Sequence, residues 1–510
     1  MKTRTISPIS STHNIKMKYT CTRNSKIEIS ASEAIVKGIS DDGGLFVPSS
    51  FPILSLADVE NLIPLDYPER AAKILSLYMD EFSFEELLGY AKRAYNRFDD
   101  DSVCPLVKVE DGLYMLELWH GPTCAFKDVA LTILPYLLTA SKKKLGIDEQ
   151  TLVLTATSGD TGKAALEGFK DVPGTHVLVF YPANGVSEMQ RMQMVTQDGD
   201  NVHVCGIKGN FDDAQTAVKR IFNDEEVVKR LKDSGIAMSS ANSINWGRLA
   251  PQIAYYISAY CDLVDSGEIE LGEKINFAVP TGNFGNVLAG YYAYRMGLPV
   301  EKFIVASNAN NVLTDFFNDG EYDINRDFFK TMSPSMDILV SSNLERLVYE
   351  LYGRDDEKVR EVYDSLKKTG RFEIDFDEVN LDKFVAGWAD EEDTKNAIAT
   401  FFDLDDYIMD THTAVAASVY NDYSCETDDE TPTVIVSTAN PYKFPVDVLG
   451  ALGSREKNPY KAIIKLYNLT ALECPDCILE LEQAKEIHTK VVERNAVKEV
   501  VLDVANQMTK

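Results

Sequence analysis

Long apolar runs are missing from this chain, although 45% of its 510 residues are hydrophobic. A membrane-spanning helix needs about 20 consecutive apolar residues, so we do not expect the protein to cross or bind a membrane. A chain of this length can bury one large core or several moderate ones. We therefore expect a soluble globular protein.

Basic residues are also scarce relative to acidic ones. The sequence has 51 lysines and arginines against 80 acidic residues, which leaves a formal net charge of −29. Such a charge repels nucleic acids and anionic membrane surfaces, so we expect neither as a partner. An anionic small molecule must then be held by local donors, such as backbone N–H groups and single arginines.

Cysteine and histidine are few and scattered, with eight and six residues respectively. The cysteines show no disulfide framework, which is typical of reduced thiols in the cytoplasm. Cys474 and Cys477 have the spacing of a metal or redox pair. A zinc site usually needs four ligands, however, and no second pair exists, with His488 the nearest candidate. We predict no metal site. His120, beside Gly121, either lines a functional site or packs behind it, and packing is the simpler reading.

The first 20 residues contain no acidic side chain and several Ser, Thr and Lys, a composition that faintly resembles a transit peptide. Only one arginine occurs there and no apolar face develops, so an ordinary N-terminal extension is favoured over a processed or disordered leader. Up to residue 100 the chain shows amphipathic helical patterns, broken by the turn-forming stretch DDGGLFVPSSFP. Helical periodicity of this kind predicts a small N-terminal helical domain over residues 1–100.

Apolar strand patterns alternate with helical patterns after Pro105. This alternation predicts an α/β fold with mostly parallel sheets flanked by helices. We predict a core over residues 101–465, which includes a charged helical insertion at about 318–405, and a C-terminal helical tail over 466–510. The strand candidates are residues 151–157, 176–182, 201–207, 235–241, 275–280, 302–307 and 433–438.

Lys127 lies in an apolar stretch, between Phe126 and Val129. A helix through this stretch would be almost wholly buried. A buried ammonium loses hydration and its pKa falls, which makes a lysine nucleophilic enough to form a Schiff base. Alternatively, Lys127 reaches the surface along its methylene groups or pairs with Asp128.

Three turns after predicted strands carry possible ligand donors, because ligands gather at the carboxyl ends of parallel strands. In the first, residues 155–165, a helix begins near Thr161 and the hydroxyls of Thr157, Ser158 and Thr161 point at one place. Such a helix start binds a carboxylate or a phosphate. Simple helix capping by Ser158 or Asp160 is the alternative.

The second turn, residues 279–295, has glycines that let the backbone curl around an anion. Gly282 and Gly285 allow the close approach, while Asn283 and Asn286 add amide donors at a helix start. The pattern is neither the nucleotide loop GxxxxGK[ST] nor the dinucleotide fingerprint GxGxxG. We predict a phosphate cradle, with purely structural glycines as the alternative.

The third turn, residues 434–444, brings Ser437 and Thr438 to the same sheet edge. A neutral hydroxyl there suits a heteroaromatic ring nitrogen, although such residues are usually turn formers. Together with Lys127 and the glycine turn, it describes a ligand with a phosphate, an aldehyde and a ring nitrogen. That ligand is pyridoxal phosphate, which acts as an electron sink.

Eight motifs between about residues 18 and 445 resemble those of the threonine synthase family, pyridoxal-phosphate enzymes of fold type II related to tryptophan synthase β. HGPTCAFKD together with TSGDTG and GNFGN is a highly specific combination. The resemblance implies a two-lobed fold and the conversion of O-phospho-L-homoserine and water to L-threonine and phosphate. The motifs are KYTCTR, DDGGLFVP, LWHGPTCAFKD, TATSGDTG, ANSINWGR, VPTGNFGN, DTHTAVA and STANPYKF.

The resemblance also assigns roles to residues. It implies that Lys127 carries the cofactor and that Thr438 faces its ring nitrogen. Asn440 stands where histidine is expected in many relatives, so a role for its side chain stays open. The residues implied to hold the cofactor phosphate are Gly282, Asn283, Phe284, Gly285 and Asn286. Candidates for binding the substrate carboxylate are Thr157, Ser158, Asp160 and Thr161. Candidates for binding its phosphate are Asn242, Ser243, Asn245 and Arg248, with helix capping plus an ion pair as the alternative.

Two other functions stay open at this point. A lyase of the same fold would only eliminate phosphate and yield a 2-keto acid, and a non-catalytic binding protein would keep the fold alone. The intact Lys127 and glycine turn favour catalysis. Because water must be excluded during elimination, we expect the lobe around residues 150–205 to close over the substrate. We expect a monomer or a homodimer.

Overall fold

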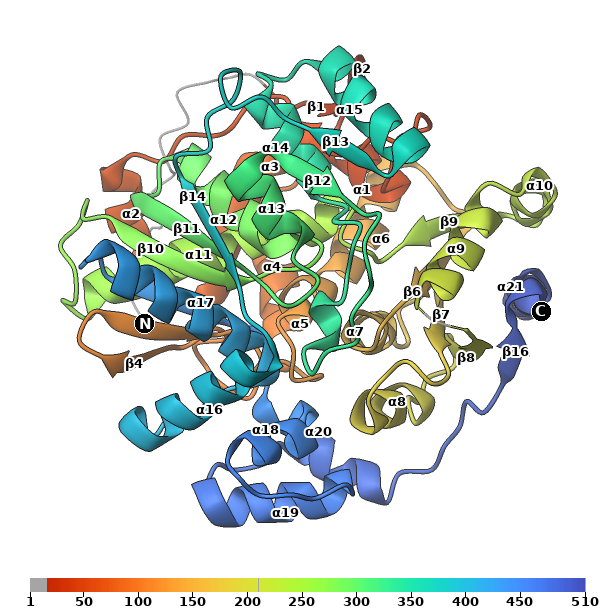
Figure 1. Cartoon of the computed structure of the whole chain (residues 1–510). Helices are drawn as coiled ribbons and strands as arrows, with labels where there is room; N and C mark the ends of the chain where they lie inside the picture. Colours follow the sequence, from red (N-terminus) through yellow and green to blue (C-terminus); the bar gives the residue numbers. More distant parts are fainter. Residues whose placement is uncertain (1–15, 210, 510) are drawn as a thin grey trace, which may run out of the picture.

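The computed structural model describes residues 16–209 and 211–509 (Figure 1). Residues 1–15 of the predicted N-terminal extension lie outside the described residues. Within the described ranges, no helix is both long and apolar enough to cross a membrane. Two sheets organise the chain, and Figure 1 shows them side by side with helices around both.

The larger sheet has six strands in the order β14-β11-β10-β15-β5-β4. Neighbouring strands run parallel except at the edge, where β4 pairs antiparallel with β5. The central strands β10, β15 and β5 are buried along their whole length, as expected for parallel strands covered on both faces. The strands are β4 (Leu106–Glu110), β5 (Leu113–Glu117), β10 (Ile275–Pro280), β11 (Val300–Ser307), β14 (Phe384–Trp388) and β15 (Thr433–Ser437).

The smaller sheet has five parallel strands in the order β16-β8-β7-β6-β9. It has a separate hydrophobic cluster, to which residues of α9, α10 and α21 contribute. The strands are β6 (Gln150–Ala156), β7 (Thr175–Pro182), β8 (Val202–Lys208), β9 (Ile236–Ser240) and β16 (Val491–Glu493). The three helices are α9 (Phe211–Phe222), α10 (Glu225–Asp233) and α21 (Val497–Met508).

The predicted α/β fold with mostly parallel sheets is confirmed, and all seven strand candidates are strands. The prediction of a helical insertion at about residues 318–405 is wrong in part. This region contains the edge strand β14 of the larger sheet and the antiparallel pair β12 (Glu321–Asp323) and β13 (Arg371–Glu373). These strands are too short for a clear alternating pattern. Its helices are α13 (Val312–Asp319), α14 (Leu344–Leu351), α15 (Asp356–Thr369) and α16 (Glu391–Asp405), with the 3₁₀ turn η1 (Pro334–Met336).

The N-terminal region is not purely helical as predicted, because it begins with a three-stranded antiparallel sheet in the order β2-β1-β3. Tyr19 of β1 packs its ring 5.2 Å from that of Trp246 in the helix α11 (Trp246–Asp265), so this region supports a central helix. Its elements are β1 (Tyr19–Cys21), β2 (Asn24–Ile29), β3 (Phe46–Pro48), α1 (Ala31–Lys37), α2 (Leu56–Leu62), α3 (Tyr67–Tyr78) and α4 (Phe84–Tyr95).

The C-terminal tail, predicted to be helical over residues 466–510, is helical only in part. After α19 (Pro459–Thr470), α20 (Asp476–Leu479) and the 3₁₀ turn η3 (Glu480–Glu482), residues 483–490 contain no helix or strand. Figure 1 shows this blue segment running across to the smaller sheet, where β16 pairs with β8. Pairing with a distant strand overrides the local helical periodicity here.

The helices that contribute residues to the cavity described below are α5 (Lys127–Leu131), α7 (Asp160–Phe169), α11 (Trp246–Asp265), α12 (Gly285–Met296) and α17 (Thr411–Thr427). The other helices are α6 (Leu134–Leu145), α8 (Glu188–Val195) and α18 (Pro445–Ala451), with the short 3₁₀ turns η2 (Pro441–Lys443) and η4 (Arg494–Ala496).

Candidate active site

One cavity brings together most of the residues that the sequence singles out. It is lined by Lys127, by the whole glycine turn at residues 282–286, and by Thr438. Four of the eight substrate-binding candidates also line it: Asp160, Thr161, Ser243 and Arg248. Residues from α7 of the smaller sheet therefore face residues from the loops of the larger one.

Lys127 is the first residue of α5 and is only 9% exposed. The loop before it is tied to the end of β15 through the backbone. Ala125 forms a bridge with Ala439, and the Phe126 N–H donates to the carbonyl of Thr438 at 2.9 Å. The amine and the Thr438 hydroxyl are therefore held at the same cavity although they are far apart in the sequence.

Burial controls the charge of Lys127. Loss of hydration lowers the pKa of its amine, an effect opposed by Asp160 and reinforced by the positive charge of Arg248. The Nζ atom lies 3.4 Å from Oδ2 of Asp160. The net shift is downward, so the neutral, nucleophilic form is more accessible than in an exposed lysine.

Asp160 connects Lys127 to a second buried lysine, Lys443, which is fully buried. Oδ1 of Asp160 lies 3.2 Å from Nζ of Lys443 and accepts a hydrogen bond from Gln190 at 3.0 Å, while Oδ2 accepts one from Ser335 at 3.0 Å. Burial opposes ionisation, but Lys443 and Lys127 together hold the pKa of Asp160 well below its usual range. Asp160 is thus an anion and is unsuited to bind the substrate carboxylate, contrary to our prediction.

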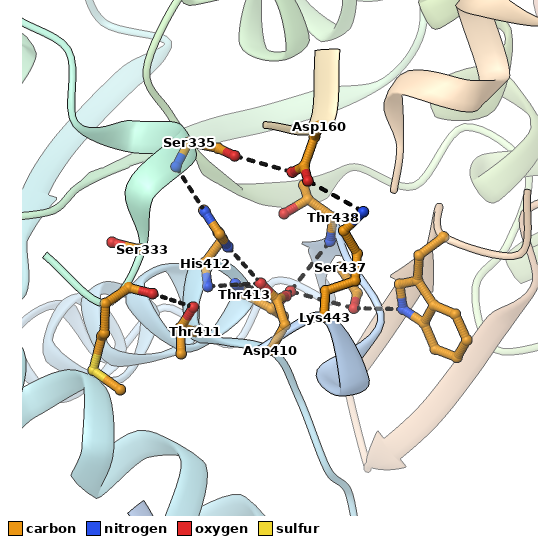
Figure 2. A network of polar contacts seen from close by, with 12 residues as sticks. Asp160, Ser333, Ser335, Asp410, Thr411, His412, Thr413, Ser437, Thr438 and Lys443 are labelled. Atoms are coloured by element: carbon orange, nitrogen blue, oxygen red, sulfur yellow. Dashed lines mark hydrogen bonds and ion pairs between the residues drawn. The ribbon is translucent and has the colours of Figure 1, made fainter. Parts of the chain in front are cut away.

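A polar network supports this side of the cavity (Figure 2). The Ser335 N–H donates to Nε2 of His412 at 3.1 Å, so the proton of the neutral ring lies on Nδ1 and is donated to Asp410 at 2.7 Å. Asp410 also caps α17. Figure 2 shows the network continuing through Thr413 toward Ser437. Ser335 is therefore anchored from one side by the start of α17 and contacts Asp160 on the other.

The glycine turn joins β10 to α12. Phe284 adopts a left-handed conformation with φ of 61° directly before the helix, which turns the chain sharply. A Cβ atom on Gly282 would lie 3.1 Å from the Ser335 carbonyl oxygen, so the chain passes close to a neighbouring backbone. The first N–H groups of a helix have no intrahelical partner, and here they face the cavity.

Two buried donors in this region have no partner. Oδ1 of Asn286 accepts hydrogen bonds from the hydroxyls of Tyr255 and Tyr256 at 2.6 and 2.7 Å, which fixes the amide, whereas Nδ2 is unpaired. Nε of Arg248 is likewise buried and unpaired. Unpaired buried donors are costly in a native structure, so these groups fit a site built for anionic ligands.

Arg248 has no acidic partner within the described residues. One guanidinium nitrogen donates to the carbonyl of Ala241 at 2.7 Å and the other to Oγ1 of Thr161 at 3.5 Å. Burial lowers the pKa of Arg248 to about 10, which still leaves it charged at neutral pH. A buried cation that lines a cavity and has no acidic partner favours the binding of an anionic ligand there.

The other four substrate-binding candidates do not line the cavity: Thr157, Ser158, Asn242 and Asn245. The hydroxyl oxygen of Thr157 accepts the N–H groups of Gly159 and Gly162, both at 2.9 Å. Asn245 caps α11 and donates to the carbonyl of Ile35 at 3.0 Å. Asn245 thus matches the capping alternative that the sequence left open for its group. Thr157 stabilises the turn before α7, where neither Ser158 nor Asp160 caps the helix.

Several cavity residues were not singled out from the sequence. His412 lines the cavity and Lys443 supports it, and both lie in motifs that carried the family resemblance. Ser335 lies in the region predicted to be an insertion, and no sequence signal distinguishes it. Asn440 accepts the N–H of Tyr442 at 2.9 Å and so caps a short 3₁₀ turn. His120 lies off the cavity between Asp99 and Glu117.

Known proteins resemble this chain over most of its length. Threonine synthase from Pseudomonas aeruginosa is 36% identical over 84% of this chain and 89% of its own. The crystal structure of pyridoxal-phosphate-bound threonine synthase from Brucella melitensis is 35% identical, with a TM-score of 0.85 over 96% of this chain and all of that one. The yeast threonine synthase structure is 32% identical, with a TM-score of 0.86.

Human threonine synthase-like 1 is 40% identical over 84% of this chain but only 58% of its own length. The chain thus spans somewhat under three fifths of that relative.

Three family descriptions match successive parts of the chain: "Threonine synthase N terminus" over residues 18–95, "Pyridoxal-phosphate dependent enzyme" over 104–376 and "Threonine synthase, C-terminal" over 413–501. The two-lobed fold and its cavity are those of a pyridoxal-phosphate-dependent enzyme of fold type II. Within that class, the chain belongs to the threonine synthase family.

Proposed function

We propose that this protein converts O-phospho-L-homoserine and water to L-threonine and phosphate. The observation that carries the proposal is a single cavity that is lined by the buried amine of Lys127, by the glycine turn and by Arg248, whose guanidinium has no acidic partner within the described residues. An amine for the cofactor and a separate cation for an anionic substrate are both needed for this reaction. Relatives named threonine synthase support the choice of substrate.

The cofactor would be held by donors that the cavity offers. The N–H groups of residues 282–286 and the unpaired Asn286 amide suit its phosphate, and the Thr438 hydroxyl suits its ring nitrogen. Lys127 is the amine available to its aldehyde. When bound, pyridoxal phosphate supplies an electron sink for negative charge that develops on the substrate carbons.

Lys127 then acts as the general acid–base group. With its pKa lowered by burial, the Nζ atom takes protons from Cα and then from Cβ of the substrate, and it returns protons to Cγ after phosphate has left and to Cα after water has added at Cβ. Asp160, 3.4 Å away, keeps the ammonium form paired after each proton is taken up. Lys127 can thus adopt both the neutral and the protonated form that the reaction needs.

The substrate phosphate binds at Arg248, with the hydroxyls of Ser243 and Thr161 as neutral donors beside it. This assignment keeps Ser243 and Arg248 in the role predicted for them and moves Thr161 from the substrate carboxylate to the substrate phosphate. Asp160, as an anion, repels the carboxylate and the phosphate of the substrate and instead orients the amines near it. A buried cation beside a leaving phosphate also stabilises the charge that develops on it.

Closure of the smaller lobe would exclude water during the elimination step. Asp160 and Thr161 belong to α7 of that lobe, whereas Lys127 begins α5 after β5, and the glycine turn follows β10, both strands of the larger sheet. The moving lobe should extend beyond residues 150–205. The strands β9 and β16 belong to the smaller sheet and α21 packs in its hydrophobic cluster, so we expect all three to move with it. Structures with and without a substrate analogue that superpose without lobe movement would contradict closure.

The activity is tested by supplying purified protein and pyridoxal phosphate with O-phospho-L-homoserine and following threonine and phosphate together. We expect equal amounts of both products. Phosphate accompanied by a 2-keto acid instead of threonine would identify a lyase and overturn the proposal. No phosphate release at all would point to a binding protein.

A further inference from the structure

Two cysteines from distant parts of the chain meet next to the Lys127 loop. The Sγ atoms of Cys124 and Cys477 lie 3.2 Å apart, although 353 positions separate them in the sequence. Cys124 precedes Lys127 by three residues and is 2% exposed, whereas Cys477 in α20 is partly exposed. The proposed reaction uses neither thiol, so their contact calls for another explanation.

The surroundings make the two thiols unequal. The hydrogen bond between them lowers the pKa of Cys477, with help from the charges of Lys443 and Lys163, although burial opposes the shift. The same hydrogen bond, together with burial, raises the pKa of Cys124. The thiolate is the reactive form of cysteine, and Cys477 is also the thiol that a reagent can reach.

We propose that Cys124 and Cys477 form a thiol modification site that is reversibly oxidised to a disulfide by small-molecule disulfides of the glutathione class. The assignment stands on the Sγ–Sγ contact, the partial exposure of Cys477 and the position of both thiols beside the loop that carries Lys127. Cys474, three residues earlier and also partly exposed, is the competing partner for Cys477.

The exchange proceeds in two steps. The thiolate of Cys477 attacks one sulfur of the small disulfide, the S–S bond of that reagent breaks, and one thiolate leaves. Cys124 then loses its proton and attacks the Cys477 sulfur of the mixed disulfide, which expels the second thiolate. Two cysteines are oxidised by two electrons in total, and one reagent disulfide is reduced to two thiols that take up the released protons.

The disulfide would affect the active site through the loop before Lys127. The Thr123 carbonyl accepts a hydrogen bond from Lys443 at 2.7 Å, and the Cys124 carbonyl accepts one from the Asn440 N–H at 3.1 Å. Just beyond Cys477, the chain runs toward β16 of the smaller sheet. The bond would thus tie the Lys127 loop to α20, from which the chain leads to the smaller sheet, and slow turnover. This consequence rests on the proposed function, whereas formation of the bond does not.

The test uses the holoenzyme with oxidised glutathione, followed by digestion without reductant and mass analysis of the peptides. We expect the peptide that carries Cys124 to be joined to the peptide that carries Cys477, and the number of free thiols to fall by two from eight. Dithiothreitol should reverse both changes. Cys474→Ser and the exposed-site control Cys425→Ser should retain the link.

Cys477→Ser should lose the link while it keeps its basal turnover. A bond between Cys474 and Cys477, a mixed disulfide that does not resolve, or no reaction would each overturn the assignment. In the wild-type protein, phosphate release should fall severalfold on oxidation and recover on reduction, and Cys477→Ser should not respond. A complete link with unchanged turnover would refute the effect on catalysis and leave the modification site standing.

Discussion

The two glycine-containing turns at the cavity, residues 157–162 and 282–286, look alike in sequence but differ in what they leave free. Both follow a parallel strand and lead into a helix, α7 and α12 respectively. In the first turn, the Thr157 oxygen accepts two N–H groups and Asp160 contributes a negative charge. In the second, the Asn286 amide nitrogen is buried without a partner. A glycine-containing turn between a strand and a helix therefore binds an anion only when its hydrogen-bond donors are not already used within the turn.

The largest effect should come from the charge in the first turn. Asp160→Asn leaves Lys443 buried without its partner, and we expect a loss of about 3–5 kcal/mol in the free energy of unfolding. Denaturant unfolding of the apoprotein measures it. Ser335→Ala, which removes only a neutral donor to the same carboxylate, is the matched control and should cost much less. Equal stability of wild type and Asp160→Asn would show that Asp160 is not the counter-charge in this network.

The same substitution should change the pH dependence of the reaction. The negative charge of Asp160 raises the pKa of Lys127 against the effect of burial, so its removal lowers that pKa further. Lys127 is active as a base when neutral, and the rate therefore rises with pH through its pKa. The acid limb of the pH–rate profile should move to lower pH in the variant. A shift to higher pH would contradict the pairing of Asp160 with Lys127.

A methyl group on a glycine should have opposite consequences in the two turns. A Cβ on Gly285 meets only ordinary contacts, 3.4 Å from Asn343 and 3.5 Å from Ser243, so Gly285→Ala should fold normally but crowd the phosphate cradle. We expect cofactor affinity to fall about tenfold, or 1.4 kcal/mol, as measured by cofactor titration.

Gly159→Ala is the counterpart in the first turn. The φ of 138° and a Cβ contact of 2.4 Å with Gln190 strain the backbone and the side chain, and we expect a loss of stability of about 1–3 kcal/mol. A loss of stability in Gly285→Ala, together with a loss of cofactor affinity alone in Gly159→Ala, would contradict the roles that we assign to the two turns.

Two neighbouring threonines separate the structural task from the binding task within the first turn. Thr157→Val removes the acceptor for two buried N–H groups and should cost about 1–3 kcal/mol of stability. Thr161→Val, at the cavity, should raise KM for the phosphorylated substrate with little change in stability. Thermal unfolding and steady-state kinetics on both variants distinguish the roles. A Thr157→Val variant with unchanged stability and a raised KM would show that Thr157 binds the substrate.

The smallest effect should come from the start of α11. Asn245→Ala removes a helix cap and should lower stability by about 1 kcal/mol, with unchanged KM. Ser243→Ala, two residues earlier but at the cavity, should raise KM modestly and leave the unfolding free energy unchanged. Matching KM increases in both variants would mean that Asn245 also reaches the substrate.

The sequence predicts most of the central architecture because the seven strand candidates are apolar segments followed by helical patterns. The edge strands β14 and β16 escape prediction, since pairing with a distant strand defines them. The same limit applies to the site. Lys127 and the glycine turn are recognisable in their motifs, but Ser335 reaches Asp160 through tertiary contacts alone. Whether a hydroxyl such as that of Thr157 binds a ligand or accepts hydrogen bonds within its own turn depends on the local geometry, which the residue type alone does not determine.

The most direct test asks which buried lysine carries the cofactor, because Lys127 and Lys443 both lie near Asp160. Borohydride reduction of the holoenzyme followed by digestion and mass analysis locates the attached pyridoxyl group. The account predicts that it is found on the peptide that contains Lys127, and that Lys127→Ala takes up no label. A pyridoxyl group on Lys443, or on any other residue of the wild-type protein, would contradict the account.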